Sequence, residues 1–470
     1  AALGNETDHV WTEEEQRRFL ANHHYFAEEF RKLGGGELNI STADAMLEWL
    51  KVYSFSQIRE MSTLELNRSL EAMWSEIKSI GSSSHIEVHT KDVSVEAKDY
   101  RNKRTFSMLP SYLNVAFIHE LKPDNSNWIR AHEEGSLYLE KTMGDQVVVQ
   151  RFAGVGTGEM AEKAMEISIK NGAEIIFTTT APMIRACRRV AARHPEVKIF
   201  NCSVCMPYTD IRTYYSRIYE GKFISGAIAG AITESDDIGY IASYPIYGVP
   251  AGINAFALGA QLTRPGAKIH LKWSCTESDP VKELREKKID VISSLDIPQQ
   301  TSQNGQWGTF RLDSNGEAEL IASPYWDWGA FYVQITRSFL SREWDASIFG
   351  KREDHAVNYW WGIASGVVGL RWTDKIPDGT KALANLLKEG IKDGSVDPFL
   401  RKIVSQDAVI RNDGKKVFSA EEILRMDWLC ENVYGSIPGF DELSEKGQAI
   451  TRLQGIYRDQ IPPAISSVQI

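Results

Sequence analysis

The sequence of 470 residues predicts an α/β protein in which two doubly wound units follow a small, mainly α-helical domain. From residue 112 onward, apolar runs of four to seven residues alternate with helical segments, which is typical of parallel strands buried on both faces. The alternation restarts after a long apolar helix at 219–233. The first hundred residues show helical periodicity instead.

The N-terminal part, residues 1–110, is predicted to be a helical module and a linker. Its first helix begins at Thr12, a good N-cap residue, and stops at the glycines 34–36. Helices are also expected at 41–53 and 62–80, each opening with Ser-Thr. Residues 81–106 contain short alternating runs, which indicate a linker with one strand pair.

The remaining elements follow in order along the chain. Strands are predicted at 114–119, 146–152, 174–180, 197–202, 237–243, 268–273 and 290–295, and helices at 129–143, 159–171, 182–194, 219–233 and 252–262. Two successive series of this kind predict two lobes with a ligand cleft between them.

Composition excludes some partners. The net charge of −10 argues against nucleic acid or an anionic membrane surface, because both require basic patches. No run of 18 apolar residues occurs, so no direct membrane insertion is expected. The chain starts without a charged and apolar leader, which fits either a cytoplasmic protein or one whose leader was removed.

The five cysteines form no closely spaced framework, so disulfides are not expected. Cys202 and Cys205 make a C-x-x-C that suits a redox pair or half of a zinc site. No partner motif accompanies it, and we expect Cys187, Cys202, Cys205, Cys275 and Cys430 to be structural thiols.

No sequence motif indicates catalysis. Gly154, Gly156 and Gly158 invite a phosphate-loop interpretation, but they lack the spacing and the Lys-Ser/Thr of such loops. A strand-to-helix turn is expected there. G-x-S-x-G and H-E-x-x-H are absent, so no enzyme, cofactor or metal is expected.

Candidate ligand residues follow the predicted strands, because ligands of doubly wound sheets bind beyond the carboxyl ends of the strands. Trp128 follows the first strand; its alternative role is packing as a core residue. Asp296 and Asp313 also stand at strand ends, where each could accept hydrogen bonds from a ligand or cap the following turn.

The stretch "SPYWDWGAFY" concentrates aromatic residues at the opening of a helix. Helical spacing predicts that Trp328 and Phe331 belong to the core. Trp326, beside the turn, is the better candidate for facing a ligand.

Taken together, residues 112–440 resemble the basic membrane protein family, substrate-binding components of ABC transporters that include purine-nucleoside receptor lipoproteins. The resemblance is strongest to members whose first loop reads W-x-x-x-H-x-x-G, matched by Trp128, His132 and Gly135. Further matching stretches are "YYSRIYEGKFISGAIAG", "IGYIASYPIYGVPAGINAFALGA", "SDPVKE", "ASPYWDWGAFY" and "FSAEEILRMDWLCENVYGSIPG".

The resemblance implies a type I periplasmic-binding-protein fold that closes on a purine base or nucleoside for an ABC permease. We expect the two-lobed domain at 111–460, with lobe 1 at about 111–233 and 322–349, lobe 2 at about 234–321, and 350–460 packing back across both. The expected ligand contacts are Asn127, Trp128, Thr180, Tyr244, Asp296, Asp313 and Trp326. Asp313 matches the acid that nucleoside-binding members direct toward the ribose. A monomer outside the cytoplasm and attached to a membrane is expected, with a cytoplasmic location as the alternative.

The chain departs from the family pattern in the second lobe. Trp326 replaces a lysine of the nucleoside-binding members, which favours a free base or another flat ligand. Glu277 replaces a second stacking aromatic, and residues 297–310 look like a loop where a helix is expected. We therefore expect a remodelled second lobe.

The helical module lies outside the resemblance and supports an alternative function. In this alternative, the two-lobed domain senses a ligand and controls the module. No basic recognition helix is present, so a partner-binding bundle fits better than DNA control. An enzyme is a third class, but His132 fits a helix-face histidine better than a catalytic base.

Overall fold

The computed structural model describes residues 62, 88–89, 112–194, 196–202, 211–276, 278–296, 308–313, 315–340 and 358–456. The expected N-terminal helices, Cys205, Glu277 and the loop at 297–307 lie outside these residues. All structural statements below concern the described part of the chain.

The chain folds as an α/β protein, which confirms the predicted class. Its strands are β1 (Val88–His89), β2 (Leu113–His119), β3 (Val147–Ala153), β4 (Ile175–Thr178), β5 (Lys198–Cys202), β6 (Ile211–Ser216), β7 (Asp237–Ala242), β8 (Lys268–Trp273), β9 (Val291–Ser293), β10 (Thr309–Leu312), β11 (Ala318–Trp326), β12 (Asn358–Trp361), β13 (Val368–Trp372), β14 (Lys402–Val404), β15 (Ile410–Asp413) and β16 (Val433–Tyr434). Its α-helices are α5 (Asn127–Met143), α6 (Glu159–Lys170), α7 (Ile184–Arg193), α8 (Ile218–Ile232), α9 (Val249–Thr263), α10 (Pro280–Glu286), α11 (Trp328–Leu340), α13 (Asp378–Asp393), α14 (Ala420–Leu424) and α15 (Glu445–Gln454). The 3₁₀ turns are η2 (Pro123–Asn125), η3 (Gly144–Gln146), η4 (Ala181–Met183) and η5 (Phe440–Glu442).

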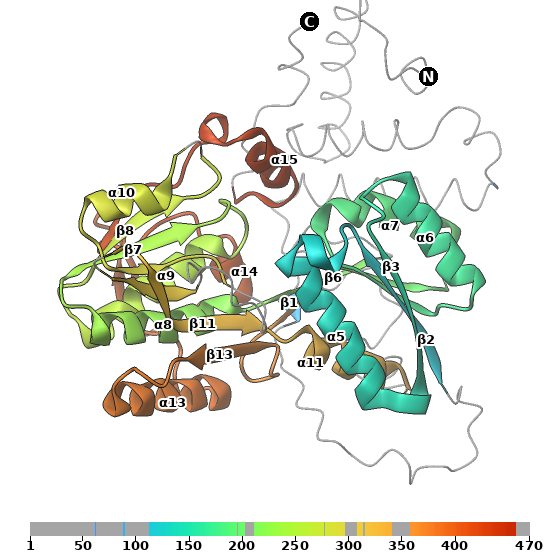
Figure 1. The fold of residues 1–470 in the computed structure, drawn as a ribbon, viewed down its shortest axis with the longest axis horizontal. Coiled ribbons are helices and arrows are strands. Elements are labelled where there is room, and N and C mark those ends of the chain that lie inside the picture. Colours follow the sequence, from blue (N-terminus) through green and yellow to red (C-terminus); the bar gives the residue numbers. More distant parts are fainter. Residues whose placement is uncertain are drawn as a thin grey trace, which may run out of the picture.

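The first unit is built on a seven-stranded sheet in the order β1-β12-β6-β5-β4-β2-β3, and every pairing in it is parallel. Figure 1 shows it beside the second unit. Alternation along β2 explains its burial on both faces: Val115 and Phe117 pack under α5 and α11, whereas Ala116 and Ile118 pack under α6 and α7. β1, inside the predicted linker, pairs with β12 rather than with a neighbouring strand.

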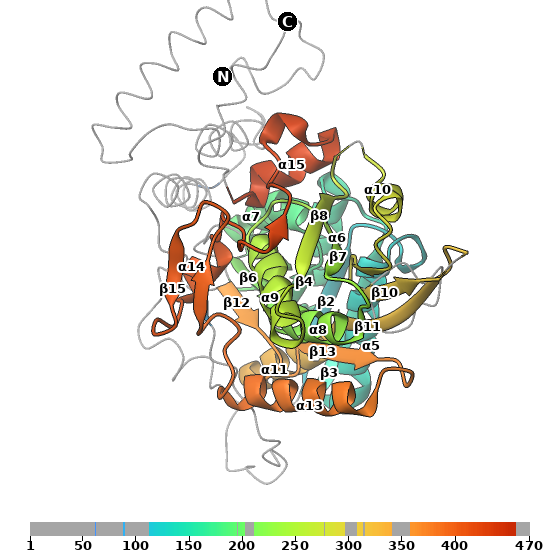
Figure 2. The same cartoon turned by 90° about the vertical axis from the view of Figure 1, so that its left-hand side faces the viewer.

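The second unit has a seven-stranded sheet in the order β13-β11-β10-β9-β7-β8-β16. The strands that the β-α pattern predicts here, β7, β8 and β9, are parallel to one another as expected. In addition, β10 runs antiparallel to both β9 and β11, and β13 runs antiparallel to β11. A parallel return to the sheet normally needs a crossover helix, and the sequence between β9 and β10 shows no helical pattern. α13 lies under β13, and β14 and β15 form a separate hairpin (Figure 2).

The chain crosses between the two sheets at three places in the described residues: from β6 to α8, from β11 to α11, and from β12 to β13. The second and third crossings are joined by a 2.8 Å hydrogen bond from Asp327 N to Val367 O. α8 packs against α9 and β11 of the second unit, and the residues after 358 contribute strands to both sheets. The exact lobe boundaries stay a prediction.

α8 and α9 cross at very short range. A Cβ atom on Gly226 would stand 2.1 Å from the carbonyl oxygen of Phe256, and one on Gly259 would stand 2.0 Å from that of Phe223. Only residues without a side chain fit at both positions. The glycines of the two family-like stretches therefore set how closely this helix pair packs.

Candidate functional site

Trp128 lies half-buried in the first turn of α5, just beyond the carboxyl end of β2. The Ser126 side chain caps the helix by accepting a hydrogen bond from Ile129 N, at 3.4 Å. The indole Nε1 of Trp128 donates a 2.8 Å hydrogen bond to the carbonyl oxygen of Thr179, which follows β4. The ring is thus held between two neighbouring strand ends, and its polar atom already has a partner.

The W-x-x-x-H-x-x-G pattern is one face of α5 turned toward α11. His132 stacks on Trp328 with ring centroids 4.6 Å apart and planes 12° apart. A Cβ on Gly135 would lie 2.9 Å from Gly329 N, so the two helices meet where neither residue has a side chain. The motif thereby fixes the helix that carries Trp128.

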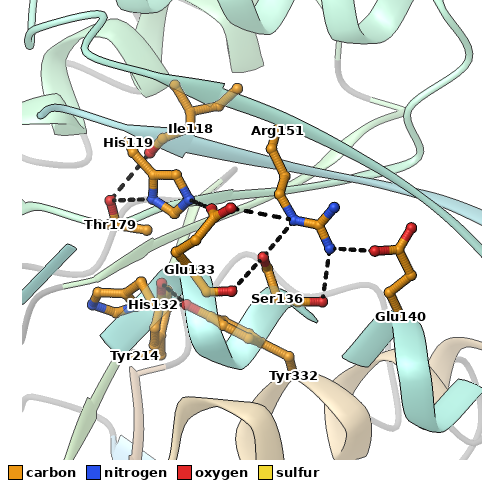
Figure 3. A network of polar contacts seen from close by, with 10 residues as sticks. All are labelled: Ile118, His119, His132, Glu133, Ser136, Glu140, Arg151, Thr179, Tyr214 and Tyr332. Carbon is orange, nitrogen blue, oxygen red and sulfur yellow. Dashed lines mark hydrogen bonds and ion pairs between the residues drawn. The ribbon is translucent and has the colours of Figure 1, made fainter. Parts of the chain in front are cut away.

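A polar network ties this helix to the sheet (Figure 3). His119, at the end of β2, contacts Thr179 Oγ1 at 3.2 Å through Nδ1 and Glu133 Oε2 at 2.9 Å through Nε2. The hydrogen bond to His119 lowers the pKa of Glu133. Arg151 of β3 donates from Nε to Ser136 Oγ at 2.7 Å and from its guanidinium to Glu140 at 2.7 Å. The network joins β2, β3 and the loop after β4 to α5.

His132 is fully buried, and its Nδ1 lies 2.6 Å from the hydroxyl of Tyr332. That hydroxyl lies 3.1 Å from the hydroxyl of Tyr214, which donates to the carbonyl oxygen of Thr178 at 3.3 Å. Burial, together with the nearby His119, lowers the pKa of His132 well below 6.5. His132 is therefore a neutral helix-face residue with a partner at Nδ1, consistent with the structural interpretation.

We expect His132 to make the fold less stable in mild acid. Its folded-state pKa is depressed, so the unfolded chain takes up a proton first as the pH falls below about 6.5, and stability is lost in that range. One pH unit below 6.5 the loss reaches about 1.4 kcal/mol. Urea unfolding at pH 7.5 and 5.5 should show this difference for the native chain and a smaller one for His132→Gln. An equal pH dependence in both proteins would rule out this assignment.

Residues of both sheets contact Trp128. Trp326, at the carboxyl end of β11, is half-buried and stands edge-to-face with Trp128 at a centroid distance of 5.1 Å. Tyr215 of β6 lies 6.3 Å from Trp128 and packs against the cores of both units. Burial, Cys202 and the charge of Asp296 raise the pKa of Tyr215. Trp128, Tyr215 and Trp326 thus lie together where strand ends of both sheets meet. Asp296 follows β9, whose carboxyl end lies at the same edge of the second sheet as that of β11.

The other expected contacts differ in position. Asn127 is exposed beside Trp128, and Thr180 is half-buried directly after the carbonyl that Trp128 binds. Tyr244 is half-buried after β7 and packs against the core of the second unit; burial and then Cys275 raise its pKa. Among the described contacts, none joins Tyr244 to Trp128.

Asp313 lies away from this group. It is exposed in the turn between β10 and β11, where its Oδ1 accepts hydrogen bonds from Asn315 N and Glu317 N, both at 2.8 Å. Because β10 is antiparallel to β9, its end lies at the opposite edge of the sheet from Asp296. Capping of the turn, the alternative left open by the sequence, is the role that these contacts support.

Two further expectations concern residues outside this group. Cys187, Cys202, Cys275 and Cys430 are free and buried, and burial raises the pKa of Cys187 to about 12, as expected for structural thiols. Gly154 and Gly156 have φ of 73° and 65° in the turn between β3 and α6, which confirms the strand-to-helix turn.

No group of three or more His, Cys, Asp or Glu side chains is placed to hold a metal ion in the described residues. No helix in the same residues is both long and apolar enough to span a bilayer.

Sequence reasoning missed His119, Thr179, Tyr215 and Lys222 as parts of the site. His119 and Thr179 lie at the ends of two strands that were predicted. Because ligands of such sheets bind beyond the carboxyl ends of the strands, both residues could have been identified from the sequence. Tyr215 belongs to β6, which was not predicted, and the role of Lys222 depends on a contact that is distant in sequence.

The chain is similar to several known proteins. Residues 112–301 match the family model described as ABC transporter substrate-binding protein, PnrA-like. The chain is 27% identical over 308 residues to a purine-binding protein of Brucella abortus, covering 63% of this chain and 85% of that one. It is 25% identical over 299 residues to a Haloferax volcanii protein provisionally described as an ABC transporter glucose-binding protein, covering 61% and 73%. A solved ABC transporter solute-binding protein from Conexibacter woesei aligns with a TM-score of 0.45 at 14% identity, over 61% of this chain and 98% of that chain.

Proposed function

Residues 112–301 belong to the family of PnrA-like ABC transporter substrate-binding proteins, and on that premise we propose that the chain captures a purine base or nucleoside for an ABC importer. Members of this family bind small molecules and deliver them to permeases rather than transform them. The resemblance noted in the sequence is thereby confirmed for this part of the chain. The identity of the ligand is the step that we add.

The observation that carries the proposal is the environment of Trp128. Its indole N–H is already bonded to Thr179, so the polar edge of the ring has a partner and the half-buried ring itself is what a ligand would contact. Trp326 and Tyr215 surround it with aromatic surface from the second sheet and from β6. Flat heterocycles gain most from such surfaces, because stacking uses their whole face. The Brucella relative, described as purine-binding, supports the same class.

A thermal-shift screen tests the ligand class. Adenine, guanine, their nucleosides, glucose and amino acids are added to the whole chain; glucose is included because of the Haloferax relative. A ligand at 100 times its dissociation constant stabilises the folded state by about 2.7 kcal/mol, which raises the midpoint by a few degrees. A shift with a purine supports the proposal, and a shift with glucose alone would contradict it.

Trp128→Ala is expected to weaken purine binding by about 1 to 3 kcal/mol, the usual value of stacking a base on an aromatic ring. Calorimetric titration of the variant measures the loss. Trp428→Ala is a matched control, because Trp428 is also half-buried but packs against Phe418 and Arg411 in the second unit. Unchanged affinity in Trp128→Ala, or an equal loss in both variants, would refute a stacking role.

The location and assembly of the chain follow as further parts of this proposal. Substrate-binding proteins of ABC importers work outside the cytoplasm, and we place this chain there. Attachment to a membrane by a lipid and a monomeric state remain predictions.

A sensing function is the second candidate, and one observation favours it. β1, which precedes the two-sheet region in sequence, pairs with β12 through Val88 and His89. β12 leads directly into the third crossing between the sheets. A movement of the two units would therefore be transmitted through β12 to Val88 and His89. Binding of a purine that also changes the protease sensitivity of residues 1–110 would support sensing.

A further inference from the structure

A lysine and an aspartate form a buried ion pair at the carboxyl edge of the second sheet. Lys222 Nζ, from α8, lies 2.7 Å from Oδ1 of Asp296, which follows β9. Their side chains are 5% and 8% exposed. A pair of this kind is weak evidence for stability, because desolvation of the two charges consumes most of their attraction. A contribution to stability therefore does not explain why this ion pair lies at the edge of the sheet.

The ammonium group of Lys222 is fully occupied. Besides Asp296, it donates to the carbonyl oxygen of Ser294 at 3.0 Å and to Ser293 Oγ at 3.5 Å, and it lies 5.2 Å from the ring centroid of Tyr240. These contacts use its three N–H groups. Lys222 therefore has no donor left for a ligand.

Asp296 differs from Lys222 in this respect. A carboxylate has two oxygens and about four acceptor positions, and the lysine engages one oxygen. The side chain also retains some exposed surface. The group that remains available in this pair is thus a hydrogen-bond acceptor whose direction is set by Lys222.

The acceptor lies next to the aromatic group of the proposed site. Asp296 follows β9 and Trp326 ends β11; these strands run in the same direction with only β10 between them, so both residues lie at one edge of the second sheet. Trp326 in turn contacts Trp128, with ring centroids 5.1 Å apart. A flat molecule on Trp128 would therefore have its edge toward the second sheet, where Asp296 stands.

We propose that Lys222 is a positioning residue that holds Asp296 to accept hydrogen bonds from N–H groups on the edge of the ligand. The site would then select heterocycles with N–H donors, such as adenine or guanine, over flat heterocycles that have none. This inference rests on the proposed capture of a flat heterocycle and specifies which members of that class bind.

The test compares adenine with caffeine, a flat bicyclic molecule without any N–H group. A site built around a hydrogen-bond acceptor discriminates strongly against a ligand that lacks the donor. The native chain should prefer adenine by at least tenfold in calorimetric titration. The double variant Lys222→Met/Asp296→Asn removes both charges together and should lose at least tenfold of that preference.

A second ion pair provides the matched control. Lys375 and Glu319 also form a lysine–carboxylate pair, but their side chains are 76% and 46% exposed. Lys375→Met/Glu319→Gln should leave the preference for adenine unchanged. If the double variant at 222 and 296 does not fold, Asp296→Glu replaces it, because it keeps the charge pair but moves the carboxylate by one methylene.

The outcomes separate the two proposals. A lower adenine preference with a nearly unchanged melting midpoint supports the role of the pair in ligand selection. An unchanged preference in a folded variant overturns this inference and leaves the capture of flat heterocycles standing. A native chain that binds neither adenine nor guanine nor their nucleosides overturns the proposed function and, with it, this inference.

Discussion

Gly259→Ala is expected to lower the free energy of unfolding by at least about 3 kcal/mol. The new Cβ would stand 2.0 Å from the carbonyl oxygen of Phe223 and 3.0 Å from Ala227 N, both backbone atoms of α8. No side-chain rotation relieves such a contact, so α8 and α9 have to move apart. Overpacking of a close interface commonly costs 1 to 3 kcal/mol and more when backbone has to shift. Urea unfolding measures the difference.

Gly379→Ala is the control for this experiment. Gly379 stands in α13 with no atom within 4 Å of an added Cβ. Alanine favours a helix over glycine, so this variant should be unchanged or more stable by up to about 1 kcal/mol. Similar losses in both variants would contradict the proposed close packing of α8 on α9.

The sequence predicts most of the first sheet because its strands are short and buried on both faces. Ile175, Ile176 and Phe177 make a continuous apolar run, and parallel strands with helices on both sides require such runs. β6 and β12 were not predicted. β12 joins the sheet between β1 and β6 after a long excursion through the second unit, and local patterns contain no information about that return.

The candidate site was predictable where a strand ends at the edge of the sheet on which the site lies. Trp128 follows β2, which is parallel to its neighbours β3 and β4. Trp326 ends β11, which runs in the same direction as β9 because the strand between them, β10, is antiparallel to both. The structure brings the two rings into contact. Asp313 shows the limit of the rule. Asp313 also follows a strand, but β10 is antiparallel to β9, so the carboxyl end of β10 lies at the opposite edge of the sheet from that of β9.

Contacts between distant residues could not be predicted from the chain. Lys222 occurs in a glycine-rich helix whose pattern indicates only burial, and Asp296 lies in a different segment after β9. Their pairing depends on how α8 lies across the end of β9. The remodelled second lobe stays a prediction; what the structure adds is that β10 returns antiparallel to β9.

Glu220→Ala is expected to destabilise the chain by about 3 to 5 kcal/mol, because Glu220 joins two of the three crossings between the sheets. Its side chain is 7% exposed and accepts hydrogen bonds from Arg217 Nε at 2.6 Å and from Ile363 N at 2.7 Å. Removing one member of a buried, hydrogen-bonded ion pair leaves the other charge inside the protein without this carboxylate. It also removes the acceptor for a buried backbone N–H.

The same substitution should affect the movement of the two units. Arg217 also donates to the carbonyl oxygen of Trp360 at 3.1 Å, and its backbone N–H donates to that of Trp361 at 2.7 Å, so the first crossing is held against the third. Glu220→Gln is the matched variant, since it keeps an oxygen for Ile363 N while it removes the charge. We expect urea unfolding to show a smaller loss for Gln than for Ala. Equal stability of the native chain and Glu220→Ala would mean that the crossings are held together by the strands alone, and ligand-induced closure would then depend on the backbone pairing between β12 and β6.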